Sequence, residues 1–183
     1  MTLRKTIIFI DGSNWYHNSK KILKNHKDID LELLSNLICK KFNFELIEIR
    51  YYNSIPDIQD NEKTYHKHLE FLDKLSKKNI IVKTRKLKRN KKSNARLEKG
   101  IDVMLATDMI RKTLLENKCD VCILLSGDAD FIPAMETIKN SKKEAISTCT
   151  YKGYSRELRN GNFRYLILKM EDVLTCIPCK NQT

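Results

Sequence analysis

The sequence has few of the residues that form linkers, and it has no long apolar run. It contains three prolines and five glycines among 183 residues, and neither an internal repeat nor a Pro/Gly/Ser-rich linker is present. The longest apolar run, residues 121–125, is far shorter than the ~20 residues that span a bilayer. The early run at 7–10 is too short for a secretory signal peptide. We therefore expect one globular domain in the cytoplasm, with no membrane segment.

Basic charge is plentiful but concentrated in one place. The chain has 35 Lys and Arg against 23 Asp and Glu, a net charge of +12. Residues 83–96 (KTRKLKRNKKSNAR, the basic segment) hold eight basic residues and no acid, which leaves +4 for the rest. A cluster this dense favours a polyanionic partner, most simply nucleic acid, over a merely solvated loop. The expected contact residues are Arg85, Lys86, Lys88, Arg89, Lys91, Lys92, Arg96 and, just after the segment, Lys99.

The six cysteines include two C-x-x-C pairs, at 119–122 and 176–179. A zinc site built on such a pair needs a tight turn, usually with glycine, and neither pair contains one. The first pair also continues directly into an apolar stretch that is typical of a buried strand. We interpret the cysteines as reduced thiols, which is their usual state in the cytosol.

Apolar runs and helical periodicity alternate along the chain. Doubly buried strands that alternate with helices predict an α/β fold, with a mostly parallel central sheet and helices on both faces. In the helix expected at 101–117, Val103, Ala106, Ile110 and Leu114 form the predicted inner face. Strands are expected at 5–10, 46–52, 80–83, 121–125, 145–150 and 165–168, and helices at 13–24, 31–41, 61–78, 101–117 and 132–140.

Acidic residues follow the strands at the positions where such sheets bind ligands, beyond the carboxyl ends of the strands. Asp11 follows the first strand, Asp128 and Asp130 follow the strand at 121–125, and Asp102 begins a helix. Each acid alone could be a turn or helix-capping residue. Together they would repel one another in one cleft, and burying them is costly unless a cation neutralises them. Oxygen ligands without His or Cys suit Mg²⁺ or Mn²⁺ better than zinc.

An acidic metal cleft beside a basic segment has the chemistry that phosphodiester hydrolysis requires. The cations hold the polyanion, and a bound metal activates water and stabilises the leaving oxygen. No covalent nucleophile is indicated. The four histidines, which we expect on helix surfaces away from the strand ends, are His17, His26, His66 and His68.

Three motifs carry a resemblance to a known family. They are FIDGSN starting at Phe9, KGIDVMLATDM at 99–109 and LLSGDADF at 124–131. In order and spacing they resemble the NYN domain, the LabA-like branch of PIN-like nucleases, over about residues 4–170. The resemblance implies a Rossmann-like, PIN-type three-layer domain over 1–170, followed by a short C-terminal tail at 171–183.

The resemblance also implies a metal-dependent ribonuclease site. By analogy Asp11, Asp102, Asp128 and Asp130 bind the metal, and Asn14 and Ser126 position metal, water or phosphate. Asp108 lies within a matching motif, but helical spacing turns it away from Asp102, so it is a supporting residue at most. The basic segment is longer than the family pattern requires, and Gly161 stands where the family usually has an acid, two residues before Phe163.

The sequence is compatible with several functions. The favoured one is an endoribonuclease that depends on Mg²⁺ or Mn²⁺. The alternatives are an RNA-binding or regulatory domain with little or no turnover and a module that docks an acidic protein. A phosphatase of haloacid-dehalogenase type is disfavoured, because Ser13 stands where that chemistry needs a second aspartate. Trp15 and Tyr16 could stack on an unpaired base, but the favoured interpretation is that they pack the first helix against the sheet. Whether the chain forms a homodimer is left open.

The basic segment supplies the first testable prediction. Replacing Lys88, Arg89, Lys91 and Lys92 by Ala should flatten the salt dependence of RNA binding, because each lost phosphate contact removes about 0.7 from the log–log slope for single strands. Fluorescence anisotropy at several salt concentrations measures this slope. An unchanged slope would mean that the segment lies off the RNA path.

Overall fold

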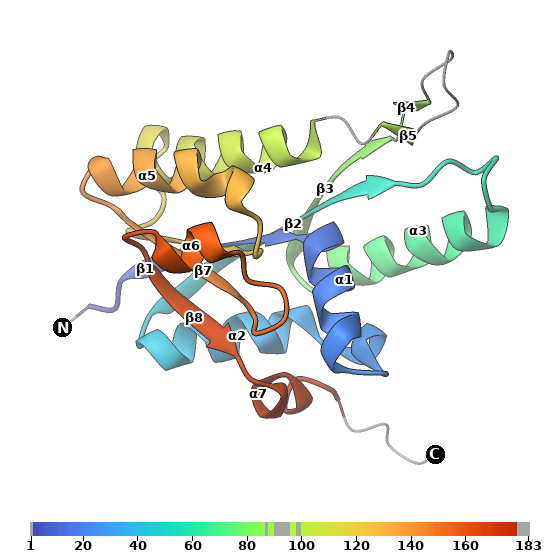
Figure 1. Ribbon diagram of the computed structural model, residues 1–183, viewed down its shortest axis with the longest axis horizontal. Coiled ribbons are helices and arrows are strands. Elements are labelled where there is room, and N and C mark those ends of the chain that lie inside the picture. Colours follow the sequence, from blue (N-terminus) through green and yellow to red (C-terminus); the bar gives the residue numbers. More distant parts are fainter. Residues whose placement is uncertain (1, 87, 90–95, 98–99, 179–183) are drawn as a thin grey trace.

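The computed structural model describes residues 2–86, 88–89, 96–97 and 100–178, without the side chains of 88–89 and 96–97. Its centre is a six-stranded parallel sheet in the order β3-β2-β1-β6-β7-β8. Figure 1 shows the sheet surrounded by helices. The strands are β1 (Lys5–Asp11), β2 (Glu45–Ile55), β3 (Ile80–Lys86), β6 (Val121–Leu125), β7 (Glu144–Thr150) and β8 (Arg164–Leu168), and β4 (Lys88–Arg89) pairs with β5 (Arg96–Leu97) in a separate antiparallel ribbon.

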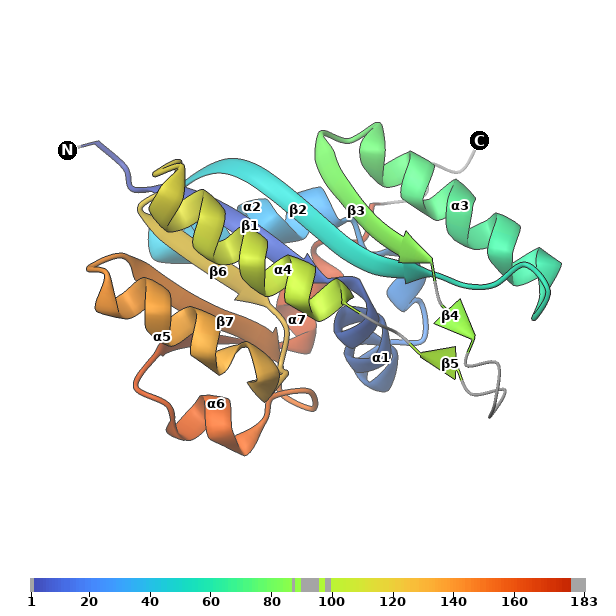
Figure 2. The same ribbon diagram turned by 90° about the horizontal axis from the view of Figure 1, so that it is seen from above.

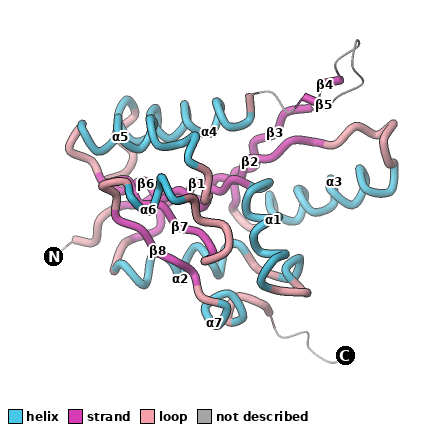
Figure 3. The backbone as a smooth tube through the Cα atoms, in the orientation of Figure 1, coloured by secondary structure: helices cyan, strands magenta, loops and turns pink. Residues whose placement is uncertain are grey.

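Helices cover both faces of the sheet, so the predicted three-layer α/β fold is confirmed (Figure 3). One face carries α1 (Gly12–Ile22), α2 (Leu31–Phe42), α3 (Glu62–Ser76) and α7 (Met170–Leu174). The other carries α4 (Ile101–Ile110), α5 (Ile132–Asn140) and α6 (Arg156–Asn160). Figure 2 shows α4 and α5 side by side across the strands. The shorter turns are η1 (His26–Asp28), η2 (Arg111–Leu115) and η3 (Ala129–Phe131).

The central strands are apolar on both faces, because each face is covered. In β1, Ile8 and Ile10 pack into the core on the α1–α3 side, and Ile7 and Phe9 pack into the core under α4 and α5. All four side chains are fully buried. This alternation is what a parallel sheet covered by helices on both sides requires.

The strand order places β1 between β2 and β6, which is where the winding direction of the chain reverses. From β1 the chain builds outward through β2 and β3, and it then returns to add β6, β7 and β8 on the other side. In sheets of this kind a crevice forms at the carboxyl ends of the two strands at the reversal point. Asp11 ends β1 and Ser126 follows β6, so both lie at that point.

The prediction for the helix at 101–117 is wrong in two respects. Val103, expected to face inward, is 69% exposed, and the fully buried apolar side chains are those of Ile101, Leu105 and Met109. The other three residues of the expected inner face are half-buried and do pack against this core, namely Ala106, Ile110 and Leu114. Apolar side chains occur nearly all round α4 (IDVMLATDMI), so their periodicity does not single out one face. The α-helix also ends at Ile110 and continues as the π-helical turn η2.

The segment predicted to be a tail, 171–183, includes most of α7. Helix α7 places Val173 in the core on the α2 side, and Cys176 is buried there as well. Residues 179–183, Cys179 included, lie outside the described part of the chain. In the described part, no helix is long and apolar enough to cross a bilayer.

Five cysteines lie in the described residues, and all five are free and buried. Burial raises the pKa of Cys39 to about 12 and that of Cys149 to about 11. Cys119 and Cys122 lie in the same part of the core, next to the buried Thr113, whose hydroxyl accepts a weak hydrogen bond from the thiol of Cys119. These thiols are therefore held as protonated, apolar core groups.

Helix α4 is fixed to the sheet by a buried carboxylate. Asp108 accepts hydrogen bonds from Arg50 Nη1 (3.1 Å), Tyr52 Oη (2.7 Å) and Arg111 Nη2 (2.6 Å). Burial opposes the charge of Asp108, but these donors outweigh it and lower its pKa. Asp108 therefore links α4 to β2 and sets the position of the helix that begins beside Asp102.

We expect Asp108→Ala to lower the free energy of unfolding by about 3 kcal/mol, because it leaves Arg50 buried without this partner. Because the pKa of Asp108 is lowered, its contribution is complete above the ordinary pKa of the carboxyl group and is lost as the pH falls through the lowered value. Urea unfolding at pH 7 and pH 3 measures both effects. Asp73→Ala removes an exposed ion pair with Lys77 and is the control; equal losses in both variants would contradict the role of Asp108.

Candidate functional site

The carboxylate of Asp11 is buried between the first turn of α1 and the loop after β6. Asp11 is only 6% exposed. Its Oδ1 accepts a hydrogen bond from the Asn14 backbone N–H at 3.0 Å, which caps α1, and its Oδ2 accepts one from Ser126 Oγ at 3.0 Å. Asp11 is therefore both the N-cap of α1 and a hydrogen-bond partner of the loop after β6.

The hydrogen bonds continue into the loop after β6. Ser126 Oγ accepts from the Asp128 N–H at 3.2 Å, and Asp128 Oδ1 accepts from the Asp130 N–H at 3.0 Å. Ser126 thus joins the two predicted metal ligands Asp11 and Asp128. One carboxylate oxygen of Asp128 is occupied in capping η3, and Oδ2 is not part of this hydrogen bond.

Asn14 connects the helix to the same loop. Its side-chain oxygen accepts hydrogen bonds from the Gly127 N–H at 3.0 Å and from Asn18 Nδ2 at 2.7 Å. Gly127 itself touches the next loop so closely that an added Cβ would lie 1.7 Å from the carbonyl oxygen of Gly153. Only glycine fits there, and this contact fixes the loop that carries Ser126 and Asp128.

These groups open onto a cavity of about 310 Å³. It brings together three of the four predicted metal ligands, Asp11, Asp102 and Asp128, from three separate parts of the chain. Asp130 is exposed on η3 and is not among the lining residues. The remaining lining residues are Ser13, Asn14, His17, Asn18 and Lys21.

The acidic residues of this cavity (the acidic cavity) influence one another electrostatically. Burial, together with the charges of Asp102 and Asp128, raises the pKa of Asp11 to about 6, although the hydrogen bonds from Asn14 and Ser126 act in the opposite direction. An aspartate whose charge is this unfavourable at neutral pH is typical of a functional site. The fold holds Asp11 in a place where a cation would stabilise it.

The donor chemistry of the cavity fits a hard divalent cation, but the acids do not form a closed cage. All its acidic donors are carboxylate oxygens, which Mg²⁺ and Mn²⁺ prefer. Within the described residues, no group of three or more His, Cys, Asp or Glu side chains is close enough together to hold a metal ion. Mg²⁺ commonly uses one or two carboxylates and keeps several water ligands, and Asp11 with Asp128 or Asp102 suits that mode.

Besides Ser13, three cavity residues were missed from the sequence, namely His17, Asn18 and Lys21. Counted from Asn14 they fall at i+3, i+4 and i+7, which is one face of a helix. This polar face is a usable signal. The acidic residues at the strand ends do not point to this face, because its side chains reach the site from the body of α1.

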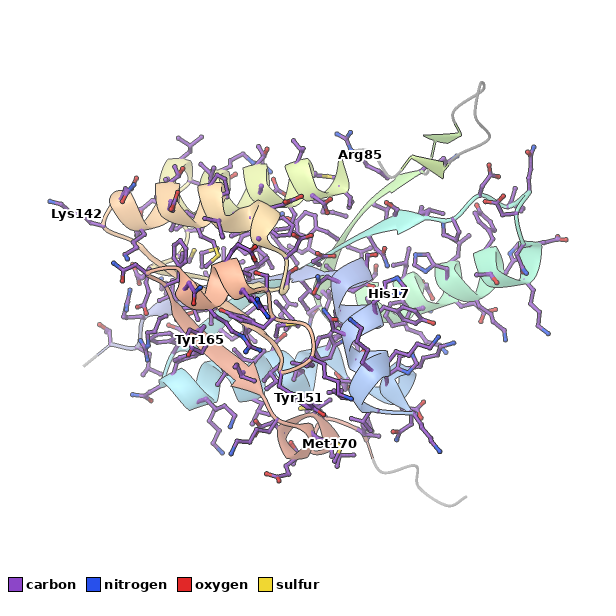
Figure 4. The ribbon with its side chains drawn as sticks, in the orientation of Figure 1. His17, Arg85, Lys142, Tyr151, Tyr165 and Met170 are labelled. Atoms are coloured by element: carbon purple, nitrogen blue, oxygen red, sulfur yellow. The ribbon has the colours of Figure 1, made fainter. Side chains whose placement is uncertain are left out.

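The basic segment is only partly described. Arg85 and Lys86 end β3 and are exposed, and the guanidinium of Arg85 lies against Gly100, just before α4 (Figure 4). This places one predicted RNA contact next to the helix that carries Asp102. The side chains of Lys88, Arg89 and Arg96 and all of Lys91, Lys92 and Lys99 lie outside the described structure.

The aromatic and histidine predictions have mixed outcomes. Trp15 is buried in the core, as favoured, whereas its neighbour Tyr16 is 39% exposed. His17 and His66 are exposed, but His26 and His68 are half-buried and so are not simple surface residues.

The raised pKa of Asp11 gives a testable prediction for the protein without metal. Asp11→Asn keeps the shape and the acceptor for the Asn14 N–H, but removes the buried charge. A pKa raised from 3.8 to about 6 means that wild-type stability declines as the pH rises from about 4 through 6. The variant should therefore be more stable than wild type at pH 8, by up to about 3 kcal/mol, and the gain should vanish near pH 4.

Urea unfolding in EDTA between pH 4 and pH 8 measures this difference. Asp73→Asn, on the exposed side of α3, controls for the loss of one negative charge. If Asp11→Asn is less stable than wild type at pH 8, the charge of Asp11 does not destabilise the metal-free fold.

Comparison with known proteins places this geometry in a family. The family model of the NYN domain matches residues 5–169. The chain is 28% identical over 165 residues to the low amplitude and bright protein LabA of Synechococcus elongatus, covering 88% of this chain and 82% of that protein. A crystal structure of a protein of unknown function from Vibrio parahaemolyticus has a similar fold, with a TM-score of 0.65 at 16% identity, over 93% of this chain and 96% of that one.

The matched region includes Asp11, Asp102 and Asp128, together with the strands and helices that bring them to one cavity. The chain therefore belongs to the NYN domain family, which is related to the PIN-like nucleases.

Proposed function

We propose that the protein is an endoribonuclease that uses Mg²⁺ or Mn²⁺ to hydrolyse phosphodiester bonds in the acidic cavity. The observation that carries this proposal is the buried Asp11, whose pKa is raised to about 6 beside Asp102 and Asp128. The membership in a family related to PIN-like nucleases supports a nuclease-type function. The choice of RNA as substrate follows the same family relation.

Asp11, Asp102 and Asp128 would supply the oxygens that hold the ion. A divalent ion there would polarise the phosphoryl oxygen, lower the pKa of a water and stabilise the leaving oxygen. The chain's own residues keep these carboxylates in place. Ser126 holds Asp11 and receives the Asp128 N–H, and Asn14 ties α1 to the loop.

The cavity also contains a cation that can face the substrate. Lys21 lines it, and its Nζ donates to Asn18 Oδ1 at 3.0 Å. A lysine on this wall can bind a phosphate oxygen as a point charge. Arg85 lies beside the start of α4, and the other basic residues of the segment follow it in the sequence, so we propose that the strand enters from the side of Arg85.

Asp130 stays a prediction as a metal ligand. It is exposed and does not line the acidic cavity, and its N–H donates a hydrogen bond to Asp128 Oδ1. The alternative function, an RNA-binding or regulatory domain with little turnover, is favoured by one observation. The described acids do not form a ready-made group of three around one point.

Asp128→Asn tests the proposal. Removing a direct ligand should lower cleavage of labelled single-stranded RNA by more than the ~10–100-fold typical of outer-shell changes at metal sites. Binding should be retained, because the variant removes a negative charge that faces the phosphate. Cleavage assays with Mn²⁺, with EDTA, and with Mn²⁺ restored after EDTA provide the measurement, and anisotropy in EDTA gives the affinity.

Two variants accompany it. Asp130→Asn decides whether that residue is a ligand, and Asp73→Asn on α3 is the charge-matched control. A variant Asp128→Asn that cleaves like wild type would remove Asp128 from the site. Wild-type protein that binds RNA but does not cleave it with either metal would favour the regulatory function.

A further inference from the structure

A second and larger cavity lies on the other side of the first turn of α1. Its volume is about 720 Å³, within the usual range for small-molecule sites. Residues of α1, η1, the end of β2 and α3 form its walls. It shares two lining residues, Ser13 and His17, with the acidic cavity, so the two cavities adjoin across that turn.

Aromatic rings dominate one side of this cavity (the aromatic cavity). The Tyr16 ring meets the rings of His17 and His26 edge-on, at centroid distances of 5.4 and 5.1 Å. Tyr51 and Phe71 form a further edge-on pair at 5.8 Å, and both line the cavity. Since Tyr16 is 39% exposed, its ring is accessible for stacking. Rings of this kind bind unpaired bases largely independently of sequence, because every base has a π-face.

The polar groups of the walls are suited to a base edge. Nε2 of His26 and Nε2 of His68 are covered and have no hydrogen-bond partner in the described part of the chain. Leaving such atoms unpaired is unfavourable, and a ligand that brings donors and acceptors to these walls would relieve the cost. Burial lowers the pKa of His68, so its ring is mainly neutral near pH 7 and offers one donor and one acceptor.

Two lysines at the exposed part of the cavity can face the phosphates of a bound nucleotide. Lys27 of η1 and Lys67 of α3 both line it and are exposed. The combination is therefore aromatic rings and imidazoles on the walls with exposed ammonium groups beside them. This arrangement matches a nucleotide whose base is inside and whose phosphate is outside, better than it matches a purely apolar ligand.

We propose that the aromatic cavity is a base-binding subsite, which takes one unpaired base of an RNA strand while a neighbouring phosphate of that strand lies in the acidic cavity. The proposal rests on the proposed function for its substrate class. The two cavities share Ser13 and His17 in their walls. One RNA strand can therefore cross this turn of α1 from one cavity to the other. It follows that the enzyme prefers single strands, because a paired base is not free to enter.

The test uses a single-stranded RNA oligonucleotide that contains 2-aminopurine, in EDTA, so that no cleavage occurs. Stacking in the cavity should quench the 2-aminopurine fluorescence. Tyr16→Ala should remove most of the quenching and weaken binding by about five- to a hundredfold, as expected for one lost base stack. The matched control is Tyr165→Ala, which changes a somewhat more exposed tyrosine (47%) on the edge strand β8 and should bind within about twofold of wild type (Figure 4).

Two further ligands, a duplex and a free nucleotide, distinguish which kind of ligand the cavity binds. A duplex of the same sequence should bind more weakly and without further quenching, and adenosine monophosphate should compete only weakly. Monophosphate that binds as tightly as the oligonucleotide would overturn the strand proposal in favour of a free nucleotide. Circular dichroism and thermal unfolding establish that Tyr16→Ala is folded, and His68→Ala offers a second variant from the opposite wall on α3.

The outcomes separate this subsite from the nuclease proposal. Quenching that depends on Tyr16 in a protein that cleaves no RNA would support the subsite and refute the nuclease. Cleavage that depends on Asp128, with binding and fluorescence unchanged in Tyr16→Ala, would overturn the subsite and leave the nuclease intact. An absence of RNA binding by the wild-type protein would overturn both.

Discussion

The position of Asp11 is the constraint on which the site depends. The sheet reverses its winding between β1 and β6, and this puts a carboxylate under the first turn of α1 with Asp102 and Asp128 nearby. Among the described residues, two hydrogen bonds support that unfavourable charge, from the Asn14 N–H and from Ser126 Oγ. Neighbouring elements are built around the same point: Gly127 touches Gly153, and α4 is anchored through its own buried acid.

Helix α1 separates two chemically different surfaces. On one side Asn14, Asn18 and Lys21 face the acidic cavity, and on the other Trp15 and Tyr16 face the rings of α3 and η1. In the complex proposed above, this one short helix would position a phosphate and a base at once. The two surfaces meet at its first turn, where Asp11 caps the helix, so any shift of this turn would disturb both.

The sequence was sufficient for the fold class and for the residues that gather at the end of β1. Doubly apolar strands imply a covered parallel sheet, and strand ends in such a sheet meet at one edge, which brings Asp11 near the other acids. Sequence was insufficient where a choice depended on tertiary contacts. Because apolar residues occur nearly all round α4, the sequence does not show that Val103 faces solvent. Nor does it show that Asp130, on η3, is exposed and does not line the acidic cavity. Asn18 and Lys21 matter only because α1 presents that face to the loop after β6.

The buried thiols have a consequence for the study of motion. The five described cysteines are spread over α2, the approach to β6, β6 itself, β7 and the segment after α7. A thiol that is covered and protonated reacts with an alkylating reagent only when its surroundings open. Mass-spectrometric mapping of alkylation over time would therefore rank these parts of the molecule by opening frequency, with native side chains as the reporters and no label attached beforehand.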